Sequence, residues 1–255
     1  MKNILSIFTF SFLTFFSSNS FAYGDAEFLA IGISSNNFSA NNSSIHSIHG
    51  FGANPNTEND ANTIGLDSSN NSFVLEFSRS LTFNKFKIFN KELADTFLRD
   101  SFVKFDFFYD NLDFNSLSSI NVNVNNRDIT GTFNTTIDSR YGAKISIGKN
   151  LVNNLSFYAG FGLASLDYEI DNRFTNEFFV ENSTSNGRVI DSIYLVGFAY
   201  EINKDLFLDL SYSKQQSTLE SRSLFTTNTL NVGGLMINRI PVEIETINLK
   251  AVSRF

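Results

Sequence analysis

The sequence predicts an all-β fold, a transmembrane antiparallel up-and-down β-barrel of eight strands, and three observations carry this prediction. First, the last segment, 246–255, alternates Ile247, Leu249 and Ala251 with polar residues that include Lys250, and a period of two is typical of a strand. One apolar face and one charged face are expected where the first meets lipid and the second lines a lumen. The other two observations are an export signal at the N-terminus and a series of similar alternating segments between them.

The N-terminus has the pattern of a secretory signal peptide. An apolar stretch, Ile4 to Phe16, leads to small residues at Ser20 and Ala22, which predict cleavage after Ala22. A membrane anchor is the alternative, but spanning a bilayer takes about 20 apolar residues and this stretch is shorter. We expect residues 1–22 to be removed and residues 23–255 to form the barrel.

Alternating segments predict eight strands after the signal peptide. They lie at about 27–36, 72–81, 102–111, 138–148, 155–168, 189–200, 206–215 and 242–255. Long connections alternate with short ones. The long ones are 37–71, 112–137, 169–188 and 216–241, and the short ones are 149–154 and 201–205. Transmembrane barrels have short periplasmic turns and longer extracellular loops, so we expect the four long connections to be polar extracellular loops.

One connection breaks this alternation. Residues 82–101 should form a periplasmic turn, yet the segment is long and carries Lys85, Lys87 and Lys91. It either holds a short helix or extends the flanking strands. A ten-stranded barrel, with an extra hairpin in 82–101 or in the first long loop, is the alternative.

Composition is consistent with this class and excludes others. The chain has 30 Phe, 2 Pro and no Trp or Cys, so it has no disulfides and no thiol chemistry. The mean hydropathy of −0.08 does not argue against a membrane barrel, because alternation hides the lipid-facing residues in the average. The net charge of −7 argues against nucleic acid as a partner.

Alternation also assigns the two faces of each strand. Outward aromatic residues fall at strand ends, where membrane barrels carry aromatic girdles. The expected outer girdle is Tyr109, Tyr141, Tyr194 and Tyr212, and the expected periplasmic girdle is Phe157, Tyr200 and Phe255.

Eight charged side chains are expected to point into the lumen. They are Glu76, Lys104, Asp106, Arg140, Lys144, Asp209, Lys250 and Arg254. Eight strands enclose a space that side chains nearly fill, and charges removed from bulk water need partners. We therefore expect a cross-braced polar plug with small water pockets. Because basic residues outnumber acidic ones in this set, a narrow anion-selective channel is the alternative.

Two segments resemble a known family. The stretch Val196–Tyr212 is similar to the strand–turn–strand near the end of small outer-membrane barrels, namely the OmpA membrane domain, OmpX and the opacity-type surface proteins. Phe157–Gly162 looks like the preceding strand of that group, and Phe255 matches its terminal aromatic. The resemblance implies the outer membrane of a Gram-negative-type bacterium, folding by the barrel-assembly machinery, and an assembly signal at Phe255.

A fold does not define a function. We expect a structural or surface-interaction role, in adhesion or shielding, for a monomer that contacts outer-membrane lipid and a host or cell-surface ligand through its loops. A small enzyme acting on lipid A or peptides is the less favoured alternative. His46 and His49 lie in the first long connection, but without a recognisable third group they define neither a catalytic nor a metal site. We therefore expect no catalytic residues, metal or cofactor.

Overall fold

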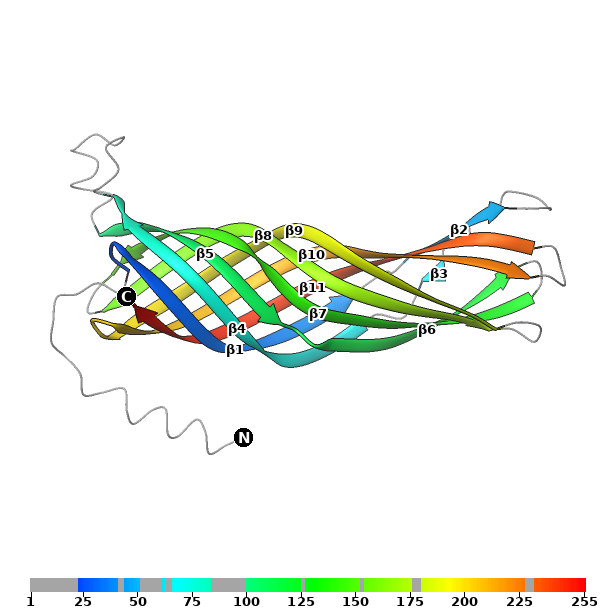
Figure 1. Ribbon diagram of the computed structural model, residues 1–255, viewed down its shortest axis with the longest axis horizontal. Helices are drawn as coiled ribbons and strands as arrows, with labels where there is room; N and C mark the ends of the chain where they lie inside the picture. Colours follow the sequence, from blue (N-terminus) through cyan, green and yellow to red (C-terminus); the bar gives the residue numbers. More distant parts are fainter. Residues whose placement is uncertain are drawn as a thin grey trace, which may run out of the picture.

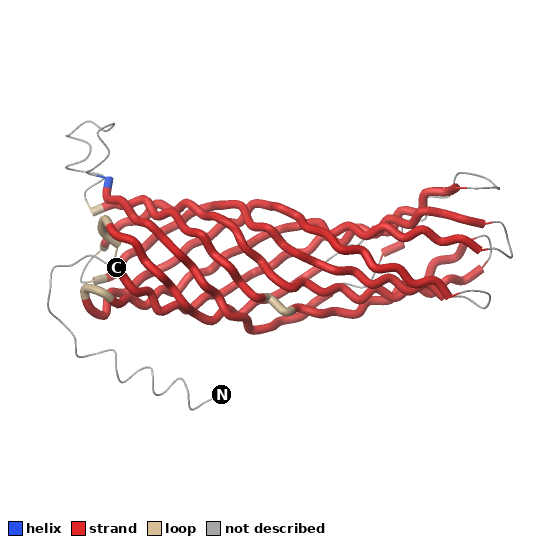
Figure 2. Tube along the Cα trace, in the orientation of Figure 1, coloured by secondary structure: helices blue, strands red, loops and turns tan. Residues whose placement is uncertain are grey.

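The computed structural model describes residues 23–40, 44–50, 61–62, 66–83, 100–124, 127–151, 154–175, 180–227 and 232–255. Over these residues the chain is almost entirely β-structure, drawn out along one axis (Figures 1 and 2). Within the described residues no helix is long and apolar enough to span a membrane.

Eight antiparallel strands close a ring, as predicted. In ring order they are β1 (Ala26–Ala40), β4 (Leu66–Thr82), β5 (Ser101–Asn111), β7 (Arg127–Asn150), β8 (Leu155–Thr175), β9 (Val180–Asn203), β10 (Leu206–Thr227) and β11 (Val232–Arg254). The ring closes where β1 pairs with β11, from Phe28 opposite Arg254 to Ser39 opposite Glu243. Over the described part of the chain no further strand enters this ring, so the ten-stranded alternative has no support there. Residues 84–99, which hold most of the unusual connection, lie outside the described residues.

Three short strands continue ring strands at the end away from the C-terminus. They are β2 (Ser44–Gly50), β3 (Ala61–Asn62) and β6 (Phe114–Val124). β2 follows β1 in the chain and pairs with β11, β3 pairs with β2 and precedes β4 in the chain, and β6 follows β5 and pairs with β7. The break between β5 and β6 contains Asp113, whose φ is 45°, a value that Asp tolerates better than most residues.

The prediction of four solvated loops is therefore wrong in detail. In the described residues three of the four long connections are β-hairpins: β6 pairs with β7 up to Val124 opposite Arg127, β8 with β9 up to Thr175 opposite Val180, and β10 with β11 up to Thr227 opposite Val232. The predicted strands ended about where the apolar residues change from the outward to the inward positions of the strand. The backbone pairing of these hairpins continues through that change.

The two ends of the molecule differ in how the strands are joined. Between β9 and β10 the ladder stops at Ile193 opposite Gln215, and between β4 and β5 it stops at Phe73 opposite Asn111. Beyond these points the described strands form two facing layers. One contains β6, β7, β8 and β9, and the other contains β10, β11, β1 with β2, and β4 with β3. We call this end the two-layer half and the closed ring the barrel half.

The outer surface of the barrel half is apolar. Every strand of the ring presents exposed apolar side chains, including Ile33, Phe77, Phe107, Ile147, Phe161, Tyr194, Leu210 and Ile247. These are the positions that alternation assigns outward, although Val103, also assigned outward, is buried. The outer surface of the two-layer half carries ion pairs instead, such as Arg188–Asp167 at 2.6 Å and Lys214–Glu243 at 2.6 Å, at its border with the barrel half.

Candidate functional site

The lumen of the barrel half begins with an aromatic layer at the end where the C-terminus lies. Tyr23 packs against rings from four strands, with centroid distances of 5.2 Å to Phe28, 5.1 Å to Phe102, 6.0 Å to Tyr158 and 6.2 Å to Phe207. All five side chains are buried. The sequence signal for this layer was the inward parity of the four strand residues, and Tyr23 itself lies before any predicted strand.

Next to the aromatic layer lies an ionic cluster centred on Glu76 of β4. Its carboxylate accepts hydrogen bonds from Lys104 Nζ at 2.9 Å, Lys144 Nζ at 2.7 Å and Lys250 Nζ at 3.1 Å. The three lysines come from β5, β7 and β11, so one carboxylate joins four strands across the lumen. This arrangement is the cross-bracing that inward charges predict.

Two further carboxylates complete the ionic cluster. Asp106 lies 3.1 Å from Lys104 Nζ, and Asp209 lies 3.2 Å from Lys250 Nζ. Tyr23 and Tyr158 each donate a hydroxyl hydrogen bond of 2.8 Å to Asp209, which ties the aromatic layer to the ionic one. Six of the eight predicted lumen charges therefore meet in one network: Glu76, Lys104, Asp106, Lys144, Asp209 and Lys250.

Arg140 belongs to a second network, further from the aromatic layer. Its guanidinium donates to Asp110 at 2.7 Å and to Thr246 at 3.0 Å, and Thr246 donates to Asn36 at 2.8 Å. Asp110 is buried; sequence reasoning placed it on a strand without counting it, although its parity points inward.

Arg254 lies at the opposite end, over the rings of Phe28 and Phe207 at 5.6 Å and 5.0 Å. Glu201 is also inward-facing and buried near that end. With Asp110 and Glu201 added to the predicted Glu76, Asp106 and Asp209, the described lumen of the barrel half holds five acidic residues. These match the five basic residues Lys104, Arg140, Lys144, Lys250 and Arg254. The excess of positive charge that suggested an anion channel is absent from this part of the chain.

Between the two layers of the other half lies an apolar core. One layer contributes Leu112, Phe114, Phe133, Ile137, Leu166, Tyr168, Ile170 and Phe174, and the facing layer contributes Phe38, Ala40, Leu219, Ile240, Val242 and Ile244. Phe38 and Phe114 stack across the core with centroids 4.1 Å apart. The interior of this half resembles that of a soluble β-sandwich, and it covers the polar lumen from the far side.

Side chains cap the edge of β10 where β9 no longer pairs with it. The backbone N–H of Glu220 donates to the Tyr168 hydroxyl at 3.1 Å, and that hydroxyl donates to the Glu220 carbonyl at 3.0 Å. Ser185 makes the same two contacts with the backbone of Arg222, at 3.3 Å and 3.2 Å. Unpaired strand edges attract other strands. These side-chain hydrogen bonds occupy the backbone groups of β10 at Glu220 and Arg222, so another strand cannot pair with β10 at these two positions.

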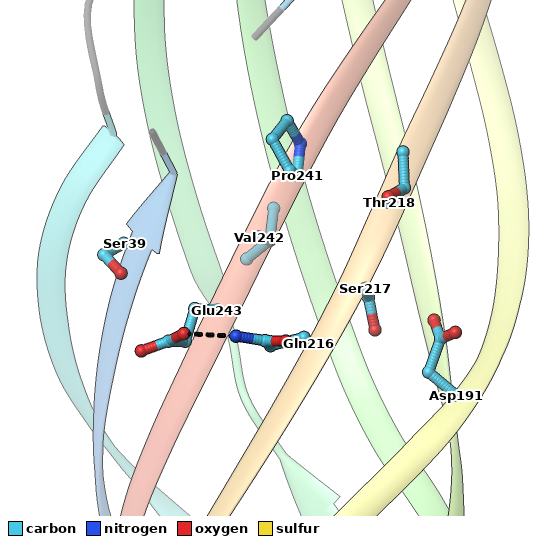
Figure 3. A pocket seen from close by; sticks show the side chains of 8 residues that line it. All are labelled: Ser39, Asp191, Gln216, Ser217, Thr218, Pro241, Val242 and Glu243. Atoms are coloured by element: carbon cyan, nitrogen blue, oxygen red, sulfur yellow. Dashed lines mark hydrogen bonds between the residues drawn. The ribbon is translucent and has the colours of Figure 1, made fainter. Parts of the chain in front are cut away.

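A pocket of about 410 Å³ lies where the two halves meet (Figure 3). It is lined by Ser39, Asp191, Gln216, Ser217, Thr218, Pro241, Val242 and Glu243. Within this lining Gln216 donates to Glu243 at 2.7 Å (Figure 3). Pro241 lacks an N–H, and it sits in β11 between the segments that pair with β1 and with β2, where that donor is not needed. Hydroxyl, amide and carboxylate groups dominate the lining.

The two histidines lie in β2, where His46 pairs with Ile237 and His49 with Gly234 of β11. Their side chains fall outside the described residues, so an enzymatic role stays untested. Among the described residues no group of three His, Asp or Glu side chains could hold a metal ion.

Of the predicted processing and assembly residues, the structure describes only Phe255. Ala22 falls outside the described residues, so cleavage after it remains a prediction. Phe255 is exposed, its ring lies 6.1 Å from that of Phe77, and its N–H donates to the Glu27 carbonyl at 3.2 Å. This position agrees with an outward aromatic girdle, and a role in assembly remains a prediction.

No protein-family model matches this chain, and no curated protein matches it. Among solved structures it is similar to Ail, the attachment invasion locus protein of Yersinia pestis, in complex with the heparin analogue sucrose octasulfate. That match has 14% identity over 91% of this chain and 99% of the other, at a TM-score of 0.37. It is also similar to the outer membrane protein OprG from Pseudomonas aeruginosa, with 11% identity over 92% and 99% and a TM-score of 0.41.

The outer membrane protease OmpT from Escherichia coli gives 10% identity over 94% and 99%, at a TM-score of 0.41. An attachment invasion locus protein and a protease are therefore both among the similar structures. Likeness of this degree says nothing about function, which has to come from the geometry of this chain.

Proposed function

We propose that this protein is a closed outer-membrane β-barrel whose two-layer half stands outside the cell as a surface for adhesion, shielding or partner contact. The observation that carries this proposal is the reversal of sidedness along continuous strands. Outward side chains are mostly apolar in the barrel half, whereas in the two-layer half many are polar or charged, with Leu117 and Val180 as exposed apolar exceptions. Lipid around the first and water around the second would satisfy both surfaces.

The height of the apolar surface suits a bilayer. On β11 the barrel-half segment runs from Thr246 to Arg254, and a transmembrane strand needs about 9–11 residues. Tyr109, Tyr194 and Tyr212 are exposed toward the two-layer end, and Phe255 is exposed at the other. Tyrosine suits an interface because its ring is apolar and its hydroxyl stays hydrated. These positions support a two-layer half that stands beyond the outer leaflet.

The filling of the lumen supports a scaffold over a channel. A conducting path would have to cross the aromatic layer, the Glu76 cluster, the Arg140 network and the apolar core in series. The described lumen charges also balance in number, so their sum favours neither anions nor cations. The channel therefore remains the second candidate and the enzyme the third, with no cofactor proposed for either.

The surface proposed for partner contact is the outer face of the two-layer half. The pocket lies at the border of this face with the barrel half. Its Gln216, Thr218 and Glu243 side chains offer hydrogen bonds to a hydroxyl-rich ligand. Such a ligand is the kind that a glycan of a host or neighbouring cell would present. The strongly negative net charge makes nucleic acid an unsuitable partner.

Whole-cell binding tests the surface role. Cells with and without the protein are applied to immobilised host glycans and matrix proteins, and expressing cells are also treated with an external protease. We expect expression to increase binding, protease to remove the increase, and the heat-modifiable barrel to stay in the outer-membrane fraction.

Binding that is equal with and without the protein would contradict the surface role. Large, steady currents from the purified protein in planar bilayers would favour the channel. Loss of lipid A modification or peptide cleavage on replacing His46 and His49 would favour the enzyme.

A further inference from the structure

Tyr23 is the first described residue, and it is also the residue that directly follows the predicted cleavage site. It does not belong to any strand, since β1 begins at Ala26. Yet its side chain is fully buried inside the mouth of the ring. A residue before the first strand has no ladder to hold it there, so its position must come from side-chain contacts.

Those contacts come from around the whole ring. The rings that pack on Tyr23 belong to β1, β5, β8 and β10. Its hydroxyl donates to Asp209 at 2.8 Å, and its carbonyl accepts from Asn150 Nδ2 at 3.3 Å. Lys104 Nζ lies 4.9 Å from the centre of its ring. The residue therefore covers the ionic cluster on the side of the mouth.

The wall of the barrel is shaped for this aromatic layer. A Cβ on Gly148 would lie 2.2 Å from the ring of Phe102, and a Cβ on Gly197 would lie 2.4 Å from the ring of Tyr158. Only glycine leaves room for these rings to lie flat against the strands. The ring of Phe102 is in turn one wall of the space that Tyr23 fills.

We propose that Tyr23 is a stopper: it closes the periplasmic mouth of the barrel and shields the Glu76–Lys104–Asp209 cluster from periplasmic water. The predicted cleavage after Ala22 would leave this stopper at the free N-terminus of the mature chain. This inference concerns the mouth of the barrel and does not depend on what the two-layer half binds.

Cysteine accessibility tests the stopper directly, because the chain has no native cysteine. Ser146 is buried, its Oγ has no hydrogen-bond partner, and it lies opposite Lys104 on the neighbouring strand. The inward position next to it toward the mouth is Gly148, at the level of the aromatic layer. Ser146→Cys therefore reports whether a small charged thiol reagent can pass Tyr23.

In the assembled full-length protein we expect the cysteine of Ser146→Cys to react slowly with the reagent. Adding Tyr23→Ala should raise this labelling rate about tenfold or more, which corresponds to a loss of about 1.4 kcal/mol of aromatic packing. Tyr23→Phe should keep the rate low, because the ring remains. Tyr194→Ala is the matched control, since Tyr194 points outward and is exposed, and it should leave the rate unchanged.

Gel mobility of unheated samples shows which variants have assembled, and Tyr23→Leu replaces Tyr23→Ala if the latter does not. Equal labelling rates in the protein with Tyr23 and in the assembled Tyr23→Ala or Tyr23→Leu variant would overturn the proposal. So would an intact mass showing that the mature chain begins after Tyr23. Neither result would bear on the surface role, and loss of cell binding would not bear on the stopper.

Discussion

The barrel half and the two-layer half are built from the same strands, but their interiors differ in polarity: the first has a polar interior and the second an apolar one. On β11 the inward positions are Lys250, Asn248 and Thr246 in the barrel half, and Ile244, Val242 and Ile240 in the two-layer half. The backbone ladder with β10 runs through the change without a shift of register. The same positions point inward throughout, so the two halves differ only in whether the inward or the outward face carries the apolar side chains.

The point along a strand where the inward residues change from polar to apolar corresponds to the edge of the membrane. β8 makes the same change: Phe161 and Leu163 face outward in one half, Leu166 and Ile170 face inward in the other, and Asp167 takes an outward position. In lipid the polar residues must gather inside, and in water the apolar ones must. The level of the reversal therefore predicts where the bilayer ends.

The largest expected contrast is between two carboxylates that each bind several basic groups. Glu76→Gln leaves three lysines around a neutral amide inside the lumen, and breaking a buried pair typically costs about 3–5 kcal/mol. Glu220→Gln breaks two exposed pairs, with Arg222 and Arg239, and surface pairs contribute about 0–1 kcal/mol.

Urea unfolding of the protein refolded in lipid vesicles measures both losses of free energy. Equal losses for the two variants would show that the lumen is as well hydrated as the outer surface. The conclusion that the lumen of the barrel half is closed to water would then be wrong.

A second contrast places lysine on the outer face of β8 in each half. Phe161→Lys should cost about 2–4 kcal/mol, because the side chain would face the middle of the bilayer. Glu169→Lys, on the same face of the strand but beyond the reversal, should change stability by less than about 0.5 kcal/mol. The measurement is the yield of heat-modifiable barrel in vesicles. A similar loss of yield for both would mean that lipid reaches the two-layer half.

A third contrast removes one methylene on each side of β11. Ile244 is buried in the apolar core, so Ile244→Val should cost about 0.5–1.5 kcal/mol. Ile247 faces outward in the barrel half and is exposed, so Ile247→Val should cost little. Amide hydrogen exchange in the two-layer half should speed up for the first variant alone. Equal exchange would argue that the two layers do not form a cooperative core.

The smallest expected effect is the pH dependence of the outer surface. Hydrogen bonds from Lys214 and Gln216 lower the pKa of Glu243 below its ordinary value of 4.5. A lowered folded-state pKa stabilises the protein above the unfolded-state pKa, and this contribution is lost as pH falls through the folded-state value. The pair is partly exposed, so we expect less than about 1 kcal/mol. Carboxyl NMR of Glu243 should show the lowered pKa, and Lys214→Ala should raise this pKa. An unchanged pKa in the variant would show that the Lys214–Glu243 ion pair does not form in solution.

The sequence alone determined the number of ring strands and the face of most of their residues. Alternation at period two assigns Glu76, Lys104 and Lys250 inward and Phe107 and Ile247 outward, because each strand residue must point to one side or the other. The same rule, applied past the reversal, would have found the two-layer half. Asp167, Glu169 and Asp171 still alternate with Leu166, Tyr168 and Ile170.

Only the tertiary structure decided which inward groups meet. Glu76 and Lys250 are far apart in the chain and lie on strands that do not pair, so their contact depends on the diameter of the ring and the tilt of its strands. Arg140 could have joined Glu76 by parity, but its height along the barrel gives it Asp110 and Thr246 instead. Tyr23 gave no periodic signal at all, because a residue before the first strand is placed by the rings around it and by Asp209, which come together only when the barrel closes.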